Sequence, residues 1–158
     1  MNSLANALGK DFVKKKEAVR IRTFELGGHT FKVKVPLTVE FELMQENMKK
    51  VDEEKVEKYY KEITKELQKD NKVEGVVFTE TDILIDNRSM REASKNKAIA
   101  EQRITEFFKL LVPEEDKFDM NNITYAMIEE LFPFPIQMQI MEEISRVVSI
   151  QYEVQKGK

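Results

Sequence analysis

The chain has 158 residues, of which 35% are charged and 41% are hydrophobic, and its formal net charge is −3 at pH 7. It contains no cysteine, which excludes disulfides, thiolate chemistry and cysteine-based metal sites. No apolar run approaches the roughly 18 residues that a membrane span requires, and residues 1–9 lack the basic start and long apolar core of a signal peptide. We therefore expect a soluble intracellular protein made of amphipathic helices with solvated faces.

Charge is distributed unevenly along the chain. Residues 1–113 carry 22 basic and 20 acidic side chains, whereas residues 114–158 carry 4 basic and 9 acidic side chains. The first part has a net charge of +2 and the second part a net charge of −5. The two parts could attract each other within one chain or between chains, although ordinary surface variation explains the same numbers.

Residues 1–17 are predicted to form a flexible N-terminal arm. Three consecutive lysines at 14–16 could contact phosphate. Asp11 and Glu17 flank this run, however, and no series of aromatic residues follows it, so we interpret the arm as a solvated tail.

A β-hairpin that leads directly into a helix is predicted between residues 23 and 38. Apolar and polar side chains alternate, with Phe24, Leu26, Phe31, Val33 and Val35 on one face and Thr23, Glu25, Lys32 and Lys34 on the other. Gly27 and Gly28 supply the positive φ angles of a tight turn. A two-residue loop and a four-residue loop give the same face assignment.

Two amphipathic helices are predicted after the hairpin. Pro36 ends the second strand because it cannot donate a ladder hydrogen bond, and Thr38 is the expected N-cap of the first helix. The apolar stripe of this helix consists of Leu37, Phe41, Met44, Met48 and Val51. The second helix is expected to begin near Asp52 as its N-cap, and its narrower stripe consists of Val56, Tyr59, Tyr60, Ile63 and Leu67.

A second short hairpin is predicted from two runs rich in β-branched residues, at 76–78 and 83–85. The acidic residues Glu80, Asp82 and Asp86 of this region raise the question of a calcium loop. An EF-hand loop needs aspartates at alternate positions followed by a glycine, and the segment has neither feature. We therefore interpret it as a structural turn.

Three further helices are predicted towards the C-terminus. The longest begins at Ser89, which forms a capping box with Glu92, and ends at Pro113. Thr124 is the expected N-cap of a short helix, and the last helix is expected to start beyond Pro135. The buried face of the last helix consists of Ile136, Ile140, Ile144, Val147 and Val148, with Met138 and Met141 beside it.

These elements predict an α+β fold that is mainly α, with an N-terminal β-hairpin followed by amphipathic helices and a possible second short hairpin. We expect a single mainly helical domain over residues 18–154, preceded by the arm over 1–17 and followed by a polar tail over 155–158.

The residues that most catalytic and cofactor sites need are missing. His29 is the only histidine and lies in a predicted turn, so neither a histidine metal site nor a catalytic triad can form. Five glycines do not make a phosphate-binding or dinucleotide-binding loop. The pairs Glu129-Glu130 and Glu142-Glu143 diverge around a helix rather than converge on one site. We expect a protein that is not an enzyme and that has no metal and no cofactor.

The chain has more apolar side chains in its helices than a small core requires. Methionines at 44, 48, 127, 138 and 141 are typical of surfaces that adapt to different partners, although each could simply fill the core. We expect self-association and partner binding through seven residues, which are Phe107, Phe108, Leu111, Phe132, Phe134, Met138 and Met141.

The hairpin and the following helix resemble a known family. The block from Thr23 through Gly28, Thr30 and the alternating Phe31, Val33 and Val35, followed by Leu37 and Thr38, is similar to the tail assembly chaperones of long-tailed bacteriophages. The similarity covers residues 20–50, about a fifth of the chain.

The resemblance implies a function in the host cell cytoplasm. Such chaperones bind and solubilise the tape measure protein, help to recruit tail tube subunits and self-associate. They are also made in a frameshifted long form, and the codons for residues 156–158 could include a slippery heptamer. Two alternatives remain. One is a structural virion component, such as a tail terminator or connector subunit, and the other is a nucleic-acid-binding regulator that uses a basic edge of Lys14, Lys15, Lys16, Arg20 and Arg22.

Overall fold

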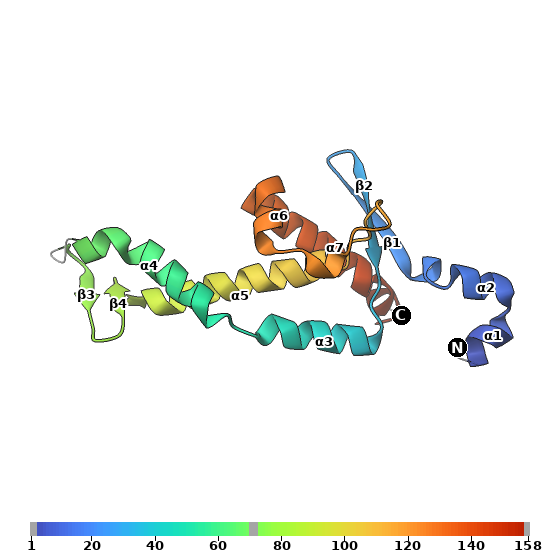
Figure 1. The fold of residues 1–158 in the computed structure, drawn as a ribbon, viewed down its shortest axis with the longest axis horizontal. Helices are drawn as coiled ribbons and strands as arrows, with labels where there is room; N and C mark the ends of the chain where they lie inside the picture. Colours follow the sequence, from blue (N-terminus) through green and yellow to red (C-terminus); the bar gives the residue numbers. More distant parts are fainter. Residues whose placement is uncertain (1–2, 70–72, 157–158) are drawn as a thin grey trace. The chain divides into compact units, whose positions relative to one another are not determined.

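The computed structural model describes residues 3–69 and 73–156, with side chains at residues 3–68 and 73–149. The fold is α+β and mainly helical, with an antiparallel hairpin near the N-terminus and a short second sheet, which confirms the predicted class (Figure 1). The chain divides into two compact units. We call Met1–Glu42 with Ile104–Lys158 the hairpin unit, and Leu43–Arg103 the central unit. The range predicted as a single domain is thus distributed over both units.

The hairpin unit is built around strands β1 (Ile21–Leu26) and β2 (His29–Lys34). Their register places Phe24 opposite Phe31, and the two rings stack with centroids 5.0 Å apart. Phe24 and Val33 are buried, whereas the polar residues Thr23, Glu25 and Lys32 are exposed, so the predicted faces are confirmed. The two-residue turn at Gly27 and Gly28 has φ angles of 60° and 80°, as the sequence predicts.

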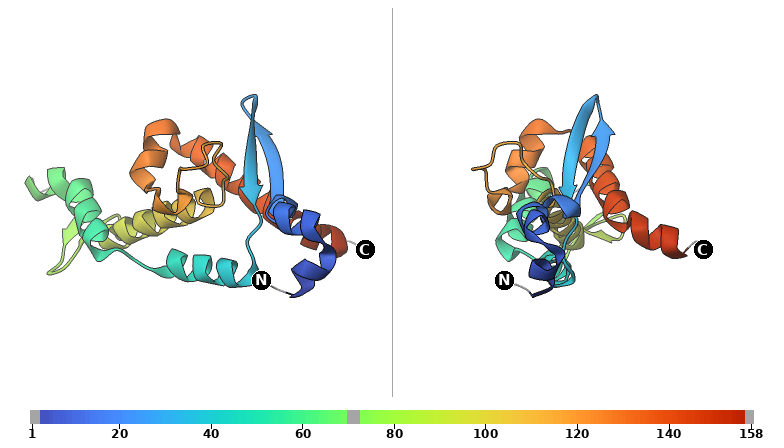
Figure 2. Two further views of the ribbon diagram at one scale, coloured as in Figure 1. Left: turned by 45° about the vertical axis from the view of Figure 1, so that its right-hand side comes forward. Right: turned by 90° about the vertical axis from the view of Figure 1, so that its right-hand side faces the viewer.

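Three helices complete the core of the hairpin unit: the C-terminal end of α5 (Met90–Phe108), α6 (Tyr125–Leu131) and α7 (Phe134–Lys156). Strands β1 and β2 both pack against α7 (Figures 1 and 2). The buried apolar side chains of this unit are Phe24, Val33, Ile104, Phe107, Phe108, Ile123, Ile128, Ile140, Met141, Ile144 and Val147. Because burying one large apolar side chain contributes roughly 1.5–3 kcal/mol, this cluster stabilises the unit strongly.

The outer edge of β2 is covered by the chain that follows α5. Two main-chain hydrogen bonds, of 2.9 and 2.8 Å, join residues 32–34 to residues 110–112. Helix α5 therefore ends at Phe108 and not at Pro113, so the predicted end of this helix is wrong. After Phe108, the N–H groups of Leu110 and Leu111 donate to carbonyls three residues back in tight turns, and the carbonyl of Leu110 and the N–H of Val112 then pair with β2.

Residues 1–17, predicted as a flexible arm, contain two short helices, α1 (Ser3–Leu8) and α2 (Lys10–Lys15). Gly9 separates them and has a φ angle of 107°. None of the residues of α1 and α2 is buried, and their principal contact is with each other.

Two helices begin one or two residues away from their predicted starts. Helix α3 (Thr38–Lys49) includes Thr38 as its first residue, and the carboxylate of Glu40 accepts a hydrogen bond of 2.8 Å from the N–H of Leu37. Helix α7 begins at Phe134 and includes Pro135 in its first turn, where the missing N–H needs no helical partner.

The central unit contains α4 (Glu53–Lys69) and a three-stranded antiparallel sheet of β3 (Val76–Phe78), β4 (Ile83–Ile85) and β5 (Arg88–Ser89). The sequence predicts β3 and β4 but not β5. The third strand forms because Asp86 and Asn87, with φ angles of 50° and 67°, make a tight turn that returns the chain along β4. Aspartate and asparagine tolerate this left-handed conformation better than most residues.

The buried apolar side chains described in the central unit are Met44, Val56, Tyr60, Ile83, Met90 and Ala98. Tyr60, Ile83 and Met90 form one buried cluster, against which Leu67, Val76 and Ile85 pack. Helix α4 has the narrow buried face that the sequence predicts, but Ile63 is 40% exposed although it belongs to the predicted stripe. As predicted, Asp52 caps this helix, accepting hydrogen bonds from the N–H groups of Glu54 and Lys55 at 3.1 and 3.4 Å.

Candidate partner-binding surfaces

Most of the seven residues predicted to bind partners lie inside the hairpin unit. Phe107, Phe108 and Met141 are buried. Leu111, Phe132 and Met138 are partly buried, and Phe134 is 54% exposed. A partner can reach the first three only if the unit opens, so their part in binding stays a prediction.

The structure brings several of these residues together as packing partners. The rings of Phe108 on α5 and Phe132 before α7 lie 5.9 Å apart, between centroids. The main chain of Leu111 pairs with that of Val33 in β2 as an isolated antiparallel β-bridge. These contacts are intramolecular. The large apolar residues at the end of α5 therefore belong to the core of the hairpin unit.

An exposed apolar surface lies where α6 meets α7. We call Met127, Leu131 and Phe134, which are 40%, 75% and 54% exposed, the α6–α7 corner. Met127 and Leu131 are four residues apart and therefore lie on one face of α6. Sequence reasoning singled out Met127 and Phe134 but missed Leu131, whose spacing from Met127 was the available signal.

Buried hydrogen bonds hold the two helices of this corner in place. Gln137 is only 1% exposed. Its amide nitrogen donates to the carbonyl of Phe132 at 2.8 Å, and its amide oxygen accepts from the hydroxyl of Tyr125 at 2.6 Å. Thr124 caps α6 as predicted, because its side chain accepts a hydrogen bond of 3.4 Å from the N–H of Met127. These hydrogen bonds fix the positions of α6 and of the start of α7, so the α6–α7 corner is a preformed surface.

Acidic residues lie close to the α6–α7 corner in the sequence. Glu129 and Glu130 are exposed on α6, and the loop before it carries exposed acidic residues at 114–116. Among the residues that the structure describes, no group of three or more acidic or histidine side chains could hold a metal ion. The acidic residues therefore give this segment of the chain a net negative charge.

The N-terminal arm has the opposite character. Leu4 and Leu8, four residues apart on α1, are 64% and 56% exposed. Exposed lysines follow at Lys10 and at 14–16. The arm therefore combines an apolar helix face with a positive charge.

Two acidic residues form ion pairs with Arg20, which follows the N-terminal arm in the sequence. Arg20 forms ion pairs with Glu40 and, at 3.6 Å, with Glu17. Its Nε also donates to the carbonyl of Val35 at 2.9 Å. The hydrogen bond from the side chain of Lys34 holds the pKa of the Glu17 carboxyl below its ordinary value, more than the small effect of burial raises it. Since Arg20 is committed to carboxylates, it is poorly placed to bind phosphate.

Polar contacts in the central unit serve its own structure. One carboxylate oxygen of Asp82 accepts hydrogen bonds from the N–H groups of Ile83 and Arg91 at 2.7 and 3.0 Å, and the other accepts from the hydroxyl of Ser89. Partial burial raises the pKa of Asp82, but these hydrogen bonds outweigh it, so the pKa lies below its ordinary value. Both carboxylate oxygens of Asp82 therefore accept hydrogen bonds, and these bonds join the segment before β4 to the start of α5.

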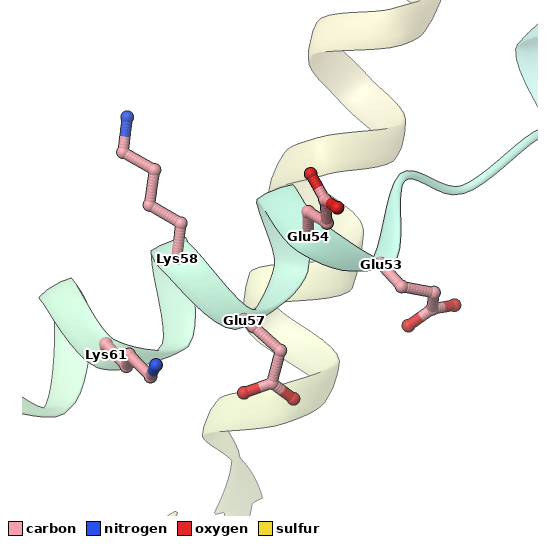
Figure 3. A pocket seen from close by; sticks show the side chains of 5 residues that line it. All are labelled: Glu53, Glu54, Glu57, Lys58 and Lys61. Atoms are coloured by element: carbon pink, nitrogen blue, oxygen red, sulfur yellow. The ribbon is translucent and has the colours of Figure 1, made fainter.

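A hollow lies on the surface of helix α4. Its lining consists of Glu53, Glu54, Glu57, Lys58 and Lys61. All five residues belong to one helix, and Figure 3 shows their side chains pointing in different directions. Glu57 forms an ion pair of 2.5 Å with Arg91, whose guanidinium lies 4.0 Å from the ring centroid of Tyr60. The hollow is a charged helix surface and offers no site for a bound substrate.

No protein-family model, curated protein or solved structure matches this chain. Among the described helices, none is long and apolar enough to cross a membrane.

Proposed function

We propose that this protein is a tail assembly chaperone of long-tailed bacteriophages, which acts in the host cell cytoplasm. In this role it binds the tape measure protein, keeps it soluble and helps to recruit tail tube subunits, without catalysing a reaction. The proposal is supported by the resemblance over residues 20–50. The order of β1, β2 and α3 in the structure agrees with the element order on which that resemblance depends.

The observation that carries the proposal is exposed apolar surface on helices. Leu131 and Val39 are each 75% exposed, and the α6–α7 corner adds two further large apolar side chains beside Leu131. Contiguous exposed apolar patches mark surfaces that bind other molecules. A long helical client offers matching apolar side chains at spacings of three and four residues. The adaptable side chain of Met127 suits such a client.

The experiment is co-expression of this chain with the tape measure protein encoded by the same phage. We expect most of the tape measure protein to be soluble with the chain and to aggregate without it. The double variant Leu131→Asp/Phe134→Asp should lower the soluble fraction several-fold, because charged side chains oppose apolar contact. Ser145→Asp, which adds a charge at an exposed position of α7, is the matched control and should leave solubility unchanged. A tape measure protein that is equally soluble with and without this chain contradicts the proposal.

The two alternatives predict different observations. A tail terminator or connector subunit would be detected in purified virions, whereas a chaperone would be absent from them. A nucleic-acid-binding regulator would bind DNA with an affinity that falls steeply with salt concentration. The ion pairs of Arg20 with Glu17 and Glu40 speak against this second alternative.

A longer translation product is a further part of the proposal. Residues 157 and 158, at the end of the predicted polar tail, lie outside the described residues, and helix α7 extends to Lys156. Sequencing the codons for residues 150–158 tests this part, because a frameshift requires a slippery heptamer there. Mass spectrometry of infected cells should then find a minor product that shares this N-terminus.

A further inference from the structure

The elements that form the α6–α7 corner carry acidic side chains and no basic ones. Residues 118–145, which include α6 and the first half of α7, contain five acidic residues and no lysine, arginine or histidine. The corner itself is apolar, and the exposed residues Pro133 and Pro135 lie beside Leu131 and Phe134 in the sequence. We propose that the α6–α7 corner binds a basic amphipathic helix, which in the proposed function is a segment of the tape measure protein. The proposal rests on that function and adds to it the charge of the client segment.

Glu130 lies at the border of the apolar face of α6, whereas Glu129 lies on the opposite side of the helix. Residues three apart are neighbours on a helix surface, so Glu130 is next to Met127. Glu129 is two positions from Met127 and two from Leu131, which places it about 200° around the helix from each at 3.6 residues per turn. Both glutamates are exposed. The two residues therefore differ in their position relative to the apolar face and not in type or exposure.

No cation compensates the charge of Glu130 in the part of the chain that the structure describes. Neither Glu129 nor Glu130 forms an ion pair there. On α7, by contrast, Glu143 is paired with Arg146 at 2.7 Å. A cation of a partner can therefore reach Glu130 at the edge of an apolar contact, where the exclusion of water strengthens the attraction.

Charge complementarity selects a basic helix among the possible occupants of the corner. The apolar side chains of such a helix, spaced three and four residues apart, can lie on Met127, Leu131 and Phe134. A lysine or arginine beside them extends its apolar stem along the corner and brings its cation to Glu130. A second α6–α7 corner or an acidic helix would bring like charges together, which disfavours contact.

The first test uses two synthetic helical peptides of about 20 residues that differ only in charge. Both have leucines at spacings of three and four and one tryptophan, and the acidic peptide has glutamates where the basic peptide has lysines. Because the chain contains no tryptophan, fluorescence of the peptide alone reports binding to the full-length protein. At about 0.15 M salt, the basic peptide should bind at least about ten times more tightly than the acidic one. Equal affinities, or no binding of the basic peptide, would overturn the proposal.

The second test reverses one charge and keeps the apolar residues. Glu130→Lys should weaken binding of the basic peptide several-fold and strengthen binding of the acidic one, and both effects should shrink at high salt. Glu129→Lys is the matched control, since it changes the net charge equally on the opposite side of α6. Its effect should be much smaller, because screening limits interactions beyond a Debye length of about 8 Å. Equal effects of the two variants would show that only net charge matters, and the proposal would be wrong.

A third pair of variants tests the apolar part of the contact. Leu131→Asp/Phe134→Asp should weaken binding of the basic peptide at least about tenfold, because it removes apolar contact area. Val39→Asp is the control, because Val39 is as exposed as Leu131 but lies on α3. Unchanged binding in the double variant, or an equal loss in the control, would contradict the assignment to the corner.

The client segment can be identified in the complex with the tape measure protein. A photo-crosslinking benzoylphenylalanine in place of Leu131 should capture a segment of that protein with helical apolar spacing and a net positive charge. The same residue in place of Ser145, which is also exposed, should capture much less of it. Capture of an acidic segment, or of a second copy of this chain instead of the client, would overturn the proposal.

These results separate the docking chemistry from the proposed function. If the chain keeps the tape measure protein soluble but its corner does not prefer the basic peptide, the chaperone function stands and uses another surface. If the corner binds the basic peptide but the tape measure protein is equally soluble without the chain, the proposed function fails and the preference for a basic helix remains.

Discussion

The hairpin unit and the central unit are stabilised in different ways. In the hairpin unit, Val33, Ile140 and Ile144 have no exposed surface, and most of its buried side chains are apolar. Among the described residues of the central unit, six apolar side chains are buried, against eleven in the hairpin unit, and three of the six form one cluster. Arg91, which lies over the ring of Tyr60 in that cluster, forms an ion pair with Glu57. A unit with little apolar volume to bury depends more on helix caps and ion pairs, which contribute less per contact and respond to pH and salt.

The largest expected effect tests this contrast with matched substitutions. Ile140→Ala in the hairpin unit should lower the free energy of unfolding by about 3–4 kcal/mol, because it opens a cavity in a closely packed core. Ile83→Ala in the central unit should cost only about 2 kcal/mol, since the small cluster near the surface can collapse around the gap. Urea denaturation followed by circular dichroism measures both. Equal losses would remove the distinction between the units.

A second substitution removes the main buried polar group of the hairpin unit. Gln137→Leu should cost about 1–3 kcal/mol, because the hydroxyl of Tyr125 and the carbonyl of Phe132 lose the hydrogen bonds that they make with the Gln137 amide. Adding Tyr125→Phe should recover part of this loss. No recovery in the double variant would show that these hydrogen bonds are not what holds the α6–α7 corner.

Asp82 tests the polar character of the central unit. Asp82→Ala should cost about 0.5–2 kcal/mol near pH 7, as the loss of a helix cap does. Because the pKa of Asp82 is below its ordinary value in the folded protein, its stabilisation is present above the ordinary value of 3.8 and is lost as the pH falls through the lower folded value. Unfolding measured from about pH 6 to pH 2 should therefore show a weaker acid dependence in the variant. Glu80→Ala is the control, and an identical change in this control would contradict the assignment.

The smallest effect concerns backbone conformation in the hairpin. Gly28→Ala should cost about 1 kcal/mol, because its φ angle of 80° is unfavourable for a residue with a Cβ atom. Nothing lies within 4 Å of the position that this Cβ would occupy, so the cost is conformational and not steric. Gly27→Asn should be better tolerated because asparagine adopts left-handed φ angles. Thermal unfolding that does not distinguish the two variants would contradict this explanation.

Local sequence signals predicted the local parts of the fold. The register of β1 and β2 follows from alternation and the two glycines, and the N-caps at Asp52 and Thr124 follow from residue type and spacing. The end of α5 could not be predicted in this way, because main-chain groups of residues 32–34 determine it. Strand β5 was missed because it has only two residues and depends on an unusual turn.

The candidate surface was predictable only in part. The sequence analysis named Phe132 and Phe134 as partner-binding residues, and the structure leaves Phe134 exposed but Phe132 partly buried. The sequence could not separate buried Phe108 from exposed Leu131, because both lie near the end of a helix among other apolar residues. Which side is covered depends on Phe132, which packs against Phe108 and leaves Leu131 outside.

The pairing of residues 32–34 with residues 110–112 has a consequence for the order of folding. The ribosome must complete the whole central unit before the hairpin can gain its neighbouring strand, and closing so long a loop carries an entropic cost. The side chain of Gln102 donates a hydrogen bond of 3.3 Å to the carbonyl of Asn47, so the two ends of the central unit meet once it is folded. A central unit that folds first shortens the loop that remains to be closed. We therefore expect it to gain protection from hydrogen exchange earlier than residues 110–112 do.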